Sequence, residues 1–328
     1  MSSATPTITQ SFTSVASAIP SCIAAATNGP NDCHDVWRYN PSIPAAIAFS
    51  FLFGITTLVH IVQATRYRMK FCWVIIMAGI WETTAFVLRI VSAHHQQSIG
   101  IFLPEELLIL LAPIWVNAFD FMLLGRMIYY FLPEKKVLGV RAIRFALYFV
   151  TMDVSTFVIQ AIGGTILSRG SAESPSRLQL GLHIYMAGIA LQETFILCFL
   201  VMTIMFHRRM LQLEHNGTLE QKGKQKWRAL LYTLYASLTL ITTRIIFRLV
   251  QYASGFNSPI PTHEIYFYAF EALPMTCALY IMNITHPGGT LVGPDSDFPV
   301  KAEQEREEIR AKKAQKLEQA RGGTTSVV

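Results

Sequence analysis

The segment FALYFVTMDVSTFVIQAIGGTIL, residues 145–167, decides which class of protein this chain belongs to. Its only charged residue is Asp153. A helix needs about 20 apolar residues to cross roughly 30 Å of hydrocarbon, and this segment supplies them. A core strand would be shorter and would alternate apolar with polar residues. The segment therefore predicts a transmembrane helix with a carboxylate inside it.

The same pattern recurs along all 328 residues. Seven apolar blocks are found, at 43–63, 71–93, 105–131, 143–167, 182–206, 227–251 and 264–285. The chain is 52% hydrophobic and 15% charged, with a mean hydropathy of +0.37, which is too little charge to cover a soluble domain of this length. We expect an all-α polytopic membrane protein with seven transmembrane helices in a domain spanning 43–287. A Ser/Thr-rich tail (1–42) precedes this domain and a charged tail (288–328) follows it.

Lysine and arginine in the loops predict the orientation. The loops after the first, third and fifth spans hold most of them, including Lys135, Arg208 and Arg209, whereas the opposite side has only Arg38, Arg169 and Arg177. Because cytoplasmic loops carry the excess of basic residues, we expect the N-terminus outside and the C-terminus in the cytosol. The net charge of +6 then reflects topology, and the sequence contains no recognisable nucleic-acid-binding module.

Two of the five cysteines fall in the outer tail. Cys22 and Cys33 would lie in an oxidising compartment, where a disulfide can persist, and we favour a bridge between them over two free thiols. Cys72, Cys198 and Cys277 fall within spans, where a free cysteine behaves as a small apolar residue.

Asp153 belongs to a stripe of polar and small residues. Thr156, Gln160 and Gly164 follow it at i+3, i+7 and i+11, on one face of a helix. Such a stripe is expected to face the helix bundle, where small residues allow close packing and an amide bonds across helices.

Other spans carry ionisable and amide groups as well. They are Glu82, Arg89, Asp120, Arg126, Gln192, Glu193, Arg244, Arg248, Glu264 and Glu271. A charge at mid-membrane costs about 2.5–3.5 kcal/mol, so each needs a partner or a task. The simpler interpretation is that ion pairs lock the bundle, with an outer network of Arg89, Arg244, Arg248, Glu264 and Glu271. The alternative, which we favour for the whole set, is a substrate or proton pathway through Glu82, Arg89, Asp153, Gln160, Gln192, Glu193, Arg244, Arg248 and Glu271.

Two prolines interrupt the spans. The ring of Pro274 obstructs the carbonyl of Phe270 and leaves a backbone acceptor beside Glu271, and Pro113 has the same effect in the third span.

The sequence lacks the motifs of several classes of membrane protein. The sequence has no G-x-x-x-x-G-K-[ST] phosphate loop and no lysine in the seventh span, which argues against an ATP motor and a retinal pump. No compact histidine pair indicates a metal site, although His60, His207 and His286 on the predicted inner side leave a zinc lipid hydrolase as an alternative. We expect no cofactor, no metal and no enzymatic activity.

Several short motifs together resemble one family. They are Tyr39-Asn-Pro-Ser, His60 with Gln63, Glu82 with Arg89, Leu111-Ala-Pro, Leu124-Gly-Arg, Asp153-Val-Ser, Gln160-Ala-Ile-Gly-Gly, Arg244-Ile-Ile-Phe-Arg, Glu271-Ala-Leu-Pro-Met and His286-Pro-Gly. With them the chain resembles the fungal lipid-translocating exporter family, which includes aminocholesterol-resistance proteins and the sphingoid long-chain-base resistance transporter. Asp120 departs from the family pattern, which has an apolar residue there.

The resemblance implies translocation or export of amphipathic lipids or lipid-like toxic compounds at the plasma membrane, giving resistance. Sphingoid long-chain bases are the leading candidates. In this interpretation Glu82, Asp153, Glu193 and Glu271 hold a cationic head group while the tail stays in lipid. The alternative is a seven-span receptor or regulator of a lipid stress response without transport activity, because the topology suits it equally well. The expected partners are membrane lipids or amphipathic small molecules, and the oligomeric state is open.

Overall fold

The computed structural model describes residues 41–96, 98–173, 175–217, 227–254, 260 and 263–291, with 310, 311 and 315. Within these residues, seven helical spans are long and apolar enough to cross a membrane, which confirms the predicted fold class. The first six are α2 (Ile43–Tyr67), α3 (Trp73–His94), α4 (Ile99–Phe131), α5 (Ala142–Glu173), α6 (Pro175–His215) and α7 (Trp227–Ala253). The seventh consists of α8 (Glu264–Phe267), the π-helix η3 (Tyr268–Ala272) and α9 (Leu273–Ile284).

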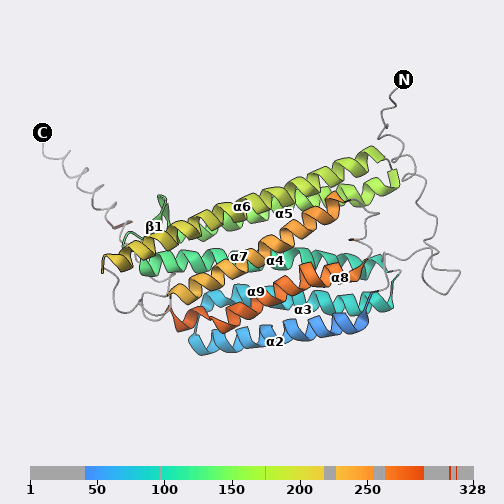
Figure 1. Cartoon of the computed structure of the whole chain (residues 1–328). Coiled ribbons are helices and arrows are strands. Elements are labelled where there is room, and N and C mark those ends of the chain that lie inside the picture. The colour runs from blue at the N-terminus through green and yellow to red at the C-terminus, as the bar shows by residue number, and fades with distance from the viewer. Residues whose placement is uncertain are drawn as a thin grey trace, which may run out of the picture.

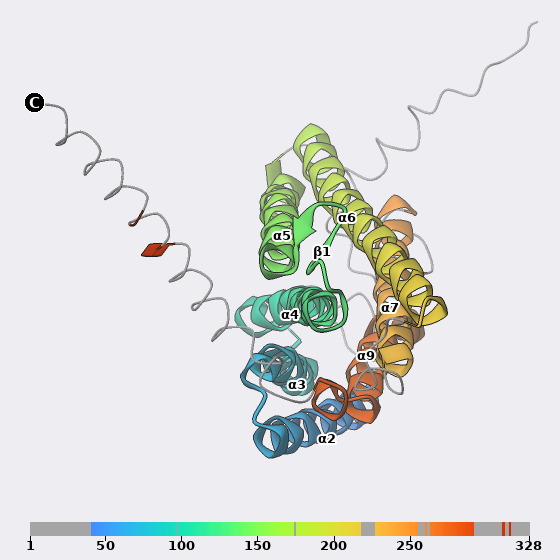
Figure 2. The same cartoon turned by 90° about the vertical axis from the view of Figure 1, so that its left-hand side faces the viewer.

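The spans lie side by side along one common direction (Figure 1). Viewed along the helices, α4 occupies the middle, with α3 on one side and α5 on the other, and α7 and α9 complete its surroundings (Figure 2). Helices α5 and α6 form one edge of the bundle and α2 and α3 the opposite edge. Side chains of α4 therefore reach most of the other spans.

Burial is inverted relative to a soluble protein. Large apolar side chains such as Leu58 and Ile265 are 62% and 68% exposed, whereas Arg89, Glu105 and Asp120 are fully buried. An apolar exterior has no cost in hydrocarbon, and buried charges away from lipid are typical of a membrane bundle. The chain is an integral membrane protein.

Glycines bring α5 and α6 into close contact. A Cβ added at Gly163 would lie 2.4 Å from the backbone nitrogen of Tyr185, and one at Gly181 would lie 2.5 Å from that of Leu167. Gly188 is also close, because its added Cβ would lie 2.7 Å from Gln160 Cγ. This small-residue interface allows the two backbones to approach closely, as expected for helices in lipid.

The helices extend beyond the predicted apolar blocks. Helix α4 begins at Ile99 rather than 105, α5 runs to Glu173 and α6 runs from Pro175 to His215. The sequence criterion stops at the first cluster of polar residues, whereas a helix continues as long as its backbone bonds can form. Between α4 and α5, strands β1 (Lys136–Val137) and β2 (Val140–Arg141) pair across Leu138 and Gly139, both at positive φ, as a two-residue hairpin turn requires.

Two short 3₁₀ turns flank the spans: η1 (Lys70–Cys72) precedes α3 and η4 (Pro287–Gly289) follows α9. Most of the two predicted tails, including Cys22 and Cys33, lies outside the described residues, so the tails and the disulfide stay predictions. Cys72, Cys198 and Cys277 are free thiols, as predicted.

Candidate functional site

Helix α4 contributes a group to each of the polar clusters described below. The side chains of Glu105, Asn117 and Asp120 and the backbone carbonyl of Ile109 bond, respectively, to α3, α5, α7 and α7. Glu105 and Asp120 lie fifteen positions apart, or about 22 Å along the axis at 1.5 Å per residue. The polar interior therefore extends along much of α4.

The first group, here called the Arg89 cluster, consists of Arg89, Glu105 and Glu264. Arg89 Nη1 donates to Glu105 Oε1 at 2.8 Å and Nη2 contacts Glu264 Oε1 at 3.4 Å. The backbone N–H of Ser42 donates to the other oxygen of Glu264 at 2.7 Å. The cluster thereby ties the start of α2 and the start of α8 to α3 and α4. Arg89 also lies over the ring of Phe267, 4.1 Å from its centroid.

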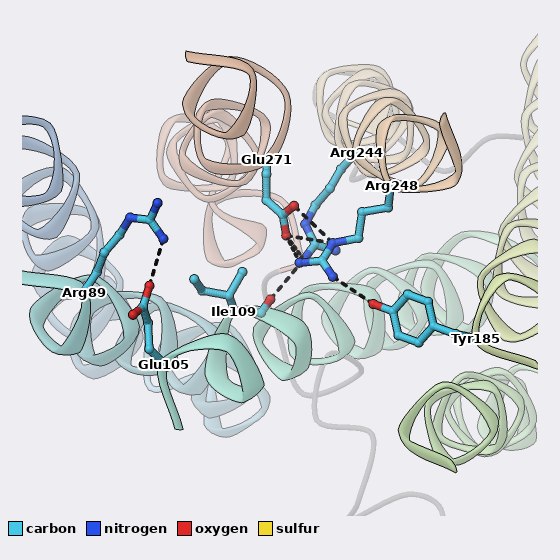
Figure 3. Close-up of polar contacts among 7 residues, drawn as sticks. All are labelled: Arg89, Glu105, Ile109, Tyr185, Arg244, Arg248 and Glu271. Atoms are coloured by element: carbon cyan, nitrogen blue, oxygen red, sulfur yellow. Dashed lines mark hydrogen bonds and ion pairs between the residues drawn. The ribbon is translucent and has the colours of Figure 1, made fainter. Parts of the chain in front are cut away.

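The second group, here called the Glu271 cluster, joins α7 to the π-helix. Arg244 Nη2 donates to Glu271 Oε1 at 2.7 Å, and Arg248 Nε donates to both carboxylate oxygens at 2.9 and 3.1 Å, with a further bond from Nη2 (Figure 3). Arg248 Nη1 also donates to the hydroxyl of Tyr185 on α6 at 3.1 Å. A bidentate guanidinium with a second arginine on the same carboxylate is a strong arrangement.

Proline explains a further contact of the Glu271 cluster. Pro113 has no N–H, so the carbonyl of Ile109 lacks its usual donor within the helix. Arg244 Nη2 supplies a donor to this carbonyl at 3.0 Å (Figure 3). The backbone acceptor that Pro113 was predicted to leave free therefore binds Arg244. At Pro274 the seventh span contains a π-helix that ends just before the proline and includes Glu271.

Further carboxylates surround the two arginines. Glu82 of α3 is buried and Glu106 of α4 is half-buried, and both lie within electrostatic range of Arg244, Arg248 and Glu271. Three carboxylates thus share two guanidinium groups. This part of the interior is acidic in balance.

The third group, here called the amide cluster, contains Asp153. Asn117 Nδ2 of α4 donates to Asp153 Oδ2 at 2.9 Å, and Gln192 Nε2 of α6 donates to Asp153 Oδ1 at 3.0 Å. Gln160 Nε2 donates to Gln192 Oε1 at 2.9 Å. Asp153, Thr156 and Gln160 are buried, which confirms that the stripe faces the bundle. Among the described residues, the partners of Asp153 are neutral amides rather than cations.

Asp120 makes a separate contact with α7. Ser237 Oγ donates to Asp120 Oδ2 at 2.6 Å, and both side chains are fully buried. Within the described residues Asp120 Oδ1 has no hydrogen-bond partner, and the same holds for Asn117 Oδ1 one turn earlier. Arg126, farther along α4, lies over the ring of Phe71.

The remaining predicted groups lie elsewhere. Glu193 of α6 has the side chain of Thr242 beside it, and no described residue forms a hydrogen bond with its Oε2. His60 Nε2 bonds to the Leu279 carbonyl at 3.1 Å, and His286 contacts Cys72 Sγ at 3.6 Å. In the described part of the chain, no group of three or more histidine, cysteine or acidic side chains is placed to hold a metal ion.

The sequence interpretation missed Glu105, Glu106, Asn117 and Tyr185 as parts of these clusters. Glu105 and Glu106 stand at the edge of a predicted block, although the apolar run IGIFL precedes them and LLILLA follows them. That flanking pattern was the available signal for a buried charge. Asn117 and Tyr185 gave none, because neutral polar residues are common in transmembrane helices.

Comparison with known proteins places the chain in a family. The chain is 43% identical over 309 residues to the probable lipid transporter atnI of Emericella nidulans, covering 92% of this chain and 80% of atnI. It is 25% identical to protoporphyrin uptake protein 1 of Saccharomyces cerevisiae, covering 76% and 91% of the two chains, and 23% identical to the sphingoid long-chain base transporter RSB1 of S. cerevisiae strain JAY291, covering 79% and 75%. No solved structure matches the chain. Residues 75–293 match the family described as RTA1 like protein, and the chain therefore belongs to the RTA1-like family.

Proposed function

We propose that this protein translocates cationic amphipathic lipids, with sphingoid long-chain bases as the leading class, and thereby gives resistance to them. Two relatives are named as lipid transporters and a third as a lipid-translocating exporter-like protein, which supports this proposal. The protein acts as a transporter without catalysing a reaction.

One observation carries the proposal. The buried carboxylate of Asp153 has only amide donors among the described residues, whereas Glu105 and Glu271 each face arginine. A charged group in hydrocarbon costs about 2.5–3.5 kcal/mol, and neutral donors offset this cost less well than a cation does. Asp153 is therefore better suited than Glu105 or Glu271 to an ammonium that arrives from outside the protein.

The surroundings of Asp153 suit a lipid. Its neighbours Met152 and Val154 are 41% and 44% exposed on the outer face of α5, and Gln192 is half-buried. The cost of moving a tail into water is about 0.8 kcal/mol per CH₂ group, so a long alkyl chain has to stay in an apolar environment. The head group would bond to Asp153, Gln160 and Gln192 while the tail follows the apolar surface of α5.

The other candidate residues have a different role in this proposal. The Arg89 and Glu271 clusters hold α3, α4, α7 and the seventh span together, and Glu82 and Glu193 offer further carboxyl groups to a cationic head group along the pathway. The receptor or regulator alternative has no specific contact in its favour.

We also propose that the protein lies in the plasma membrane with its N-terminus outside. The distribution of lysine and arginine between the loops supports this orientation. An epitope tag at each terminus tests it in intact cells. Protease added outside should remove the N-terminal tag and leave the C-terminal tag, and the reverse pattern would reject the orientation.

The transport proposal is tested with purified protein in liposomes that contain a fluorescent sphingoid base. Wild type should increase movement between leaflets, and Asp153→Asn should lower the rate about tenfold, since an ionic hydrogen bond exceeds a neutral one by about 1.4 kcal/mol. Ser155→Ala is the matched control, because Ser155 is exposed two residues along α5 and bonds only within its helix, to the Thr151 carbonyl. Equal rates for wild type and empty liposomes would refute the proposal.

A double variant separates the loss of the carboxylate from a loss of folding. Asp153→Asn combined with Asn117→Asp moves the carboxylate across the same hydrogen bond and keeps one acid and one amide in the pair. This double variant should recover part of the rate if the carboxylate acts on the head group.

A further inference from the structure

Asp120 is a buried carboxylate that neither the proposed lipid site nor the two arginine clusters use. It is fully buried, and Ser237 Oγ donates to one of its oxygens at 2.6 Å. Its other oxygen, Oδ1, has no hydrogen-bond partner among the described residues. A buried acceptor without a donor is unfavourable, so the arrangement calls for something that satisfies it.

A second orphan oxygen lies one turn away. Asn117 Oδ1 is also buried and has no partner in the part of the chain that the structure describes, although the Nδ2 of the same amide donates to Asp153 at 2.9 Å. Residues at i and i+3 on a helix have Cβ atoms about 5–6 Å apart on one face. Two acceptors without donors therefore occupy the same part of α4, and a single donor between them would serve both.

A proton on Asp120 fits this geometry better than a metal ion does. A protonated carboxyl has an O–H that can donate to the Asn117 oxygen, while its other oxygen keeps the bond from Ser237. Hard cations such as Ca²⁺ take six or more oxygen ligands, and no suitable cluster occurs among the residues that the structure describes.

Charged groups on the neighbouring helices have other partners. On α5 and α6, Asp153 accepts hydrogen bonds from Asn117 and Gln192, and Glu193 adjoins Thr242. On α7, Arg244 and Arg248 bind Glu271. At α3, Arg89 binds Glu105, Glu82 lies within electrostatic range of Arg244, and Cys72 contacts His286. Within the described residues, no charged side chain acts appreciably on Asp120. Its charge would therefore be balanced by a proton.

We propose that Asp120 takes up and releases a proton in exchange for the cationic lipid at Asp153, with Asn117 as the connection between the two carboxylates. When Asp120 is ionised, it adds negative potential near Asp153 and favours the bound ammonium. When a proton binds to Asp120, the O–H donates to Asn117, the local charge falls and the ammonium leaves. One positive charge enters as the other departs, so the exchange is electroneutral. The exchange rests on the proposed lipid transport, whereas proton binding by Asp120 does not.

Proteoliposomes with a pH difference of one unit test the exchange. Wild type should approach an about tenfold accumulation of sphingoid base in the more acidic compartment, the ratio set by one pH unit or about 1.4 kcal/mol, faster than protein-free liposomes do. An imposed membrane potential should not change this ratio. Asp120→Asn places a permanent N–H donor beside Asn117, as in the protonated state, so this variant should move sphingoid base more slowly and should lose the lipid-driven proton flux. A lipid-driven proton flux at the wild-type rate in this variant would overturn the proposal.

A second measurement needs no lipid substrate. The infrared difference spectrum between acidic and alkaline wild-type protein should contain a C=O band of a protonated carboxyl group, and Asp120→Asn should lose part of it. Ser155→Ala, the exposed control on α5, should keep the whole band. An unchanged band in Asp120→Asn would overturn the assignment of the proton. If wild type moves no lipid but Asp120→Asn loses the band, the transport proposal and its exchange fail, and the proton site stands.

Discussion

Replacing Glu271 by glutamine gives the sharpest test of how the bundle is held together. The substitution keeps the size of the side chain but removes the charge that Arg244 and Arg248 share. Both arginines are nearly buried, at 5% and 7% exposed, so water cannot replace the carboxylate. Breaking one buried ion pair costs about 3–5 kcal/mol, and denatured helices in a membrane find other partners, so we expect a loss of about 3 kcal/mol in the free energy of unfolding.

The assay is reversible unfolding of purified protein in mixed micelles. Glu134→Gln is the matched control, because the ion pair of Glu134 with Arg209 is about half exposed on both sides and such pairs contribute at most about 1 kcal/mol. Combining Glu271→Gln with Arg248→Gln should cost less than the sum of the two single losses, because the residues are in contact. A loss below about 1 kcal/mol for Glu271→Gln would refute the structural role of this cluster.

Two other predictions concern the packing of α5 against α6 and the two carboxylates that Arg89 contacts. Gly163→Ala should separate α5 from α6 and lower the midpoint of thermal unfolding, because the new Cβ would lie 2.4 Å from the backbone nitrogen of Tyr185. Gly164→Ala is the control and should be tolerated, because its Cβ would meet only ring atoms at 3.9 Å or more. Equal midpoints for the two variants would contradict the close packing. Arg89→Lys should lower the free energy of unfolding by about 1–2 kcal/mol, because one ammonium does not reproduce the separate contacts of the guanidinium with Glu105 and Glu264. An unchanged free energy of unfolding in the same micelle assay would show that a point charge suffices.

The positions of the spans could be predicted from the sequence because apolar length alone decides which segments cross a bilayer. The inward face of Asp153, Thr156 and Gln160 could be predicted as well, because a helix has one period and hydrocarbon penalises polar groups strongly. The same penalty explains why Arg244 and Arg248 were expected to find Glu271, although their exact distances depend on the packing.

Contacts between helices were harder to predict than their faces. Arg89 pairs with Glu105 as well as the expected Glu264, and this choice depends on the register of α4 against α3, which no local pattern specifies. The start of α4 at Ile99 was missed because polar residues near a boundary resemble the water interface. The role of Asn117 depends wholly on its proximity to Asp153, which the sequence separates by 36 positions.

The π-helix at Tyr268–Ala272 has a consequence for comparing relatives. Its hydrogen bonds close over five residues rather than four, so it holds one residue more than the same stretch of α-helix. One residue corresponds to about 100° of rotation, so a relative with a plain α-helix here should have a one-residue gap, and alignments forced without that gap would mismatch the positions on one side of it. Substitution statistics for Glu271 and its neighbours are meaningful only when that gap is allowed.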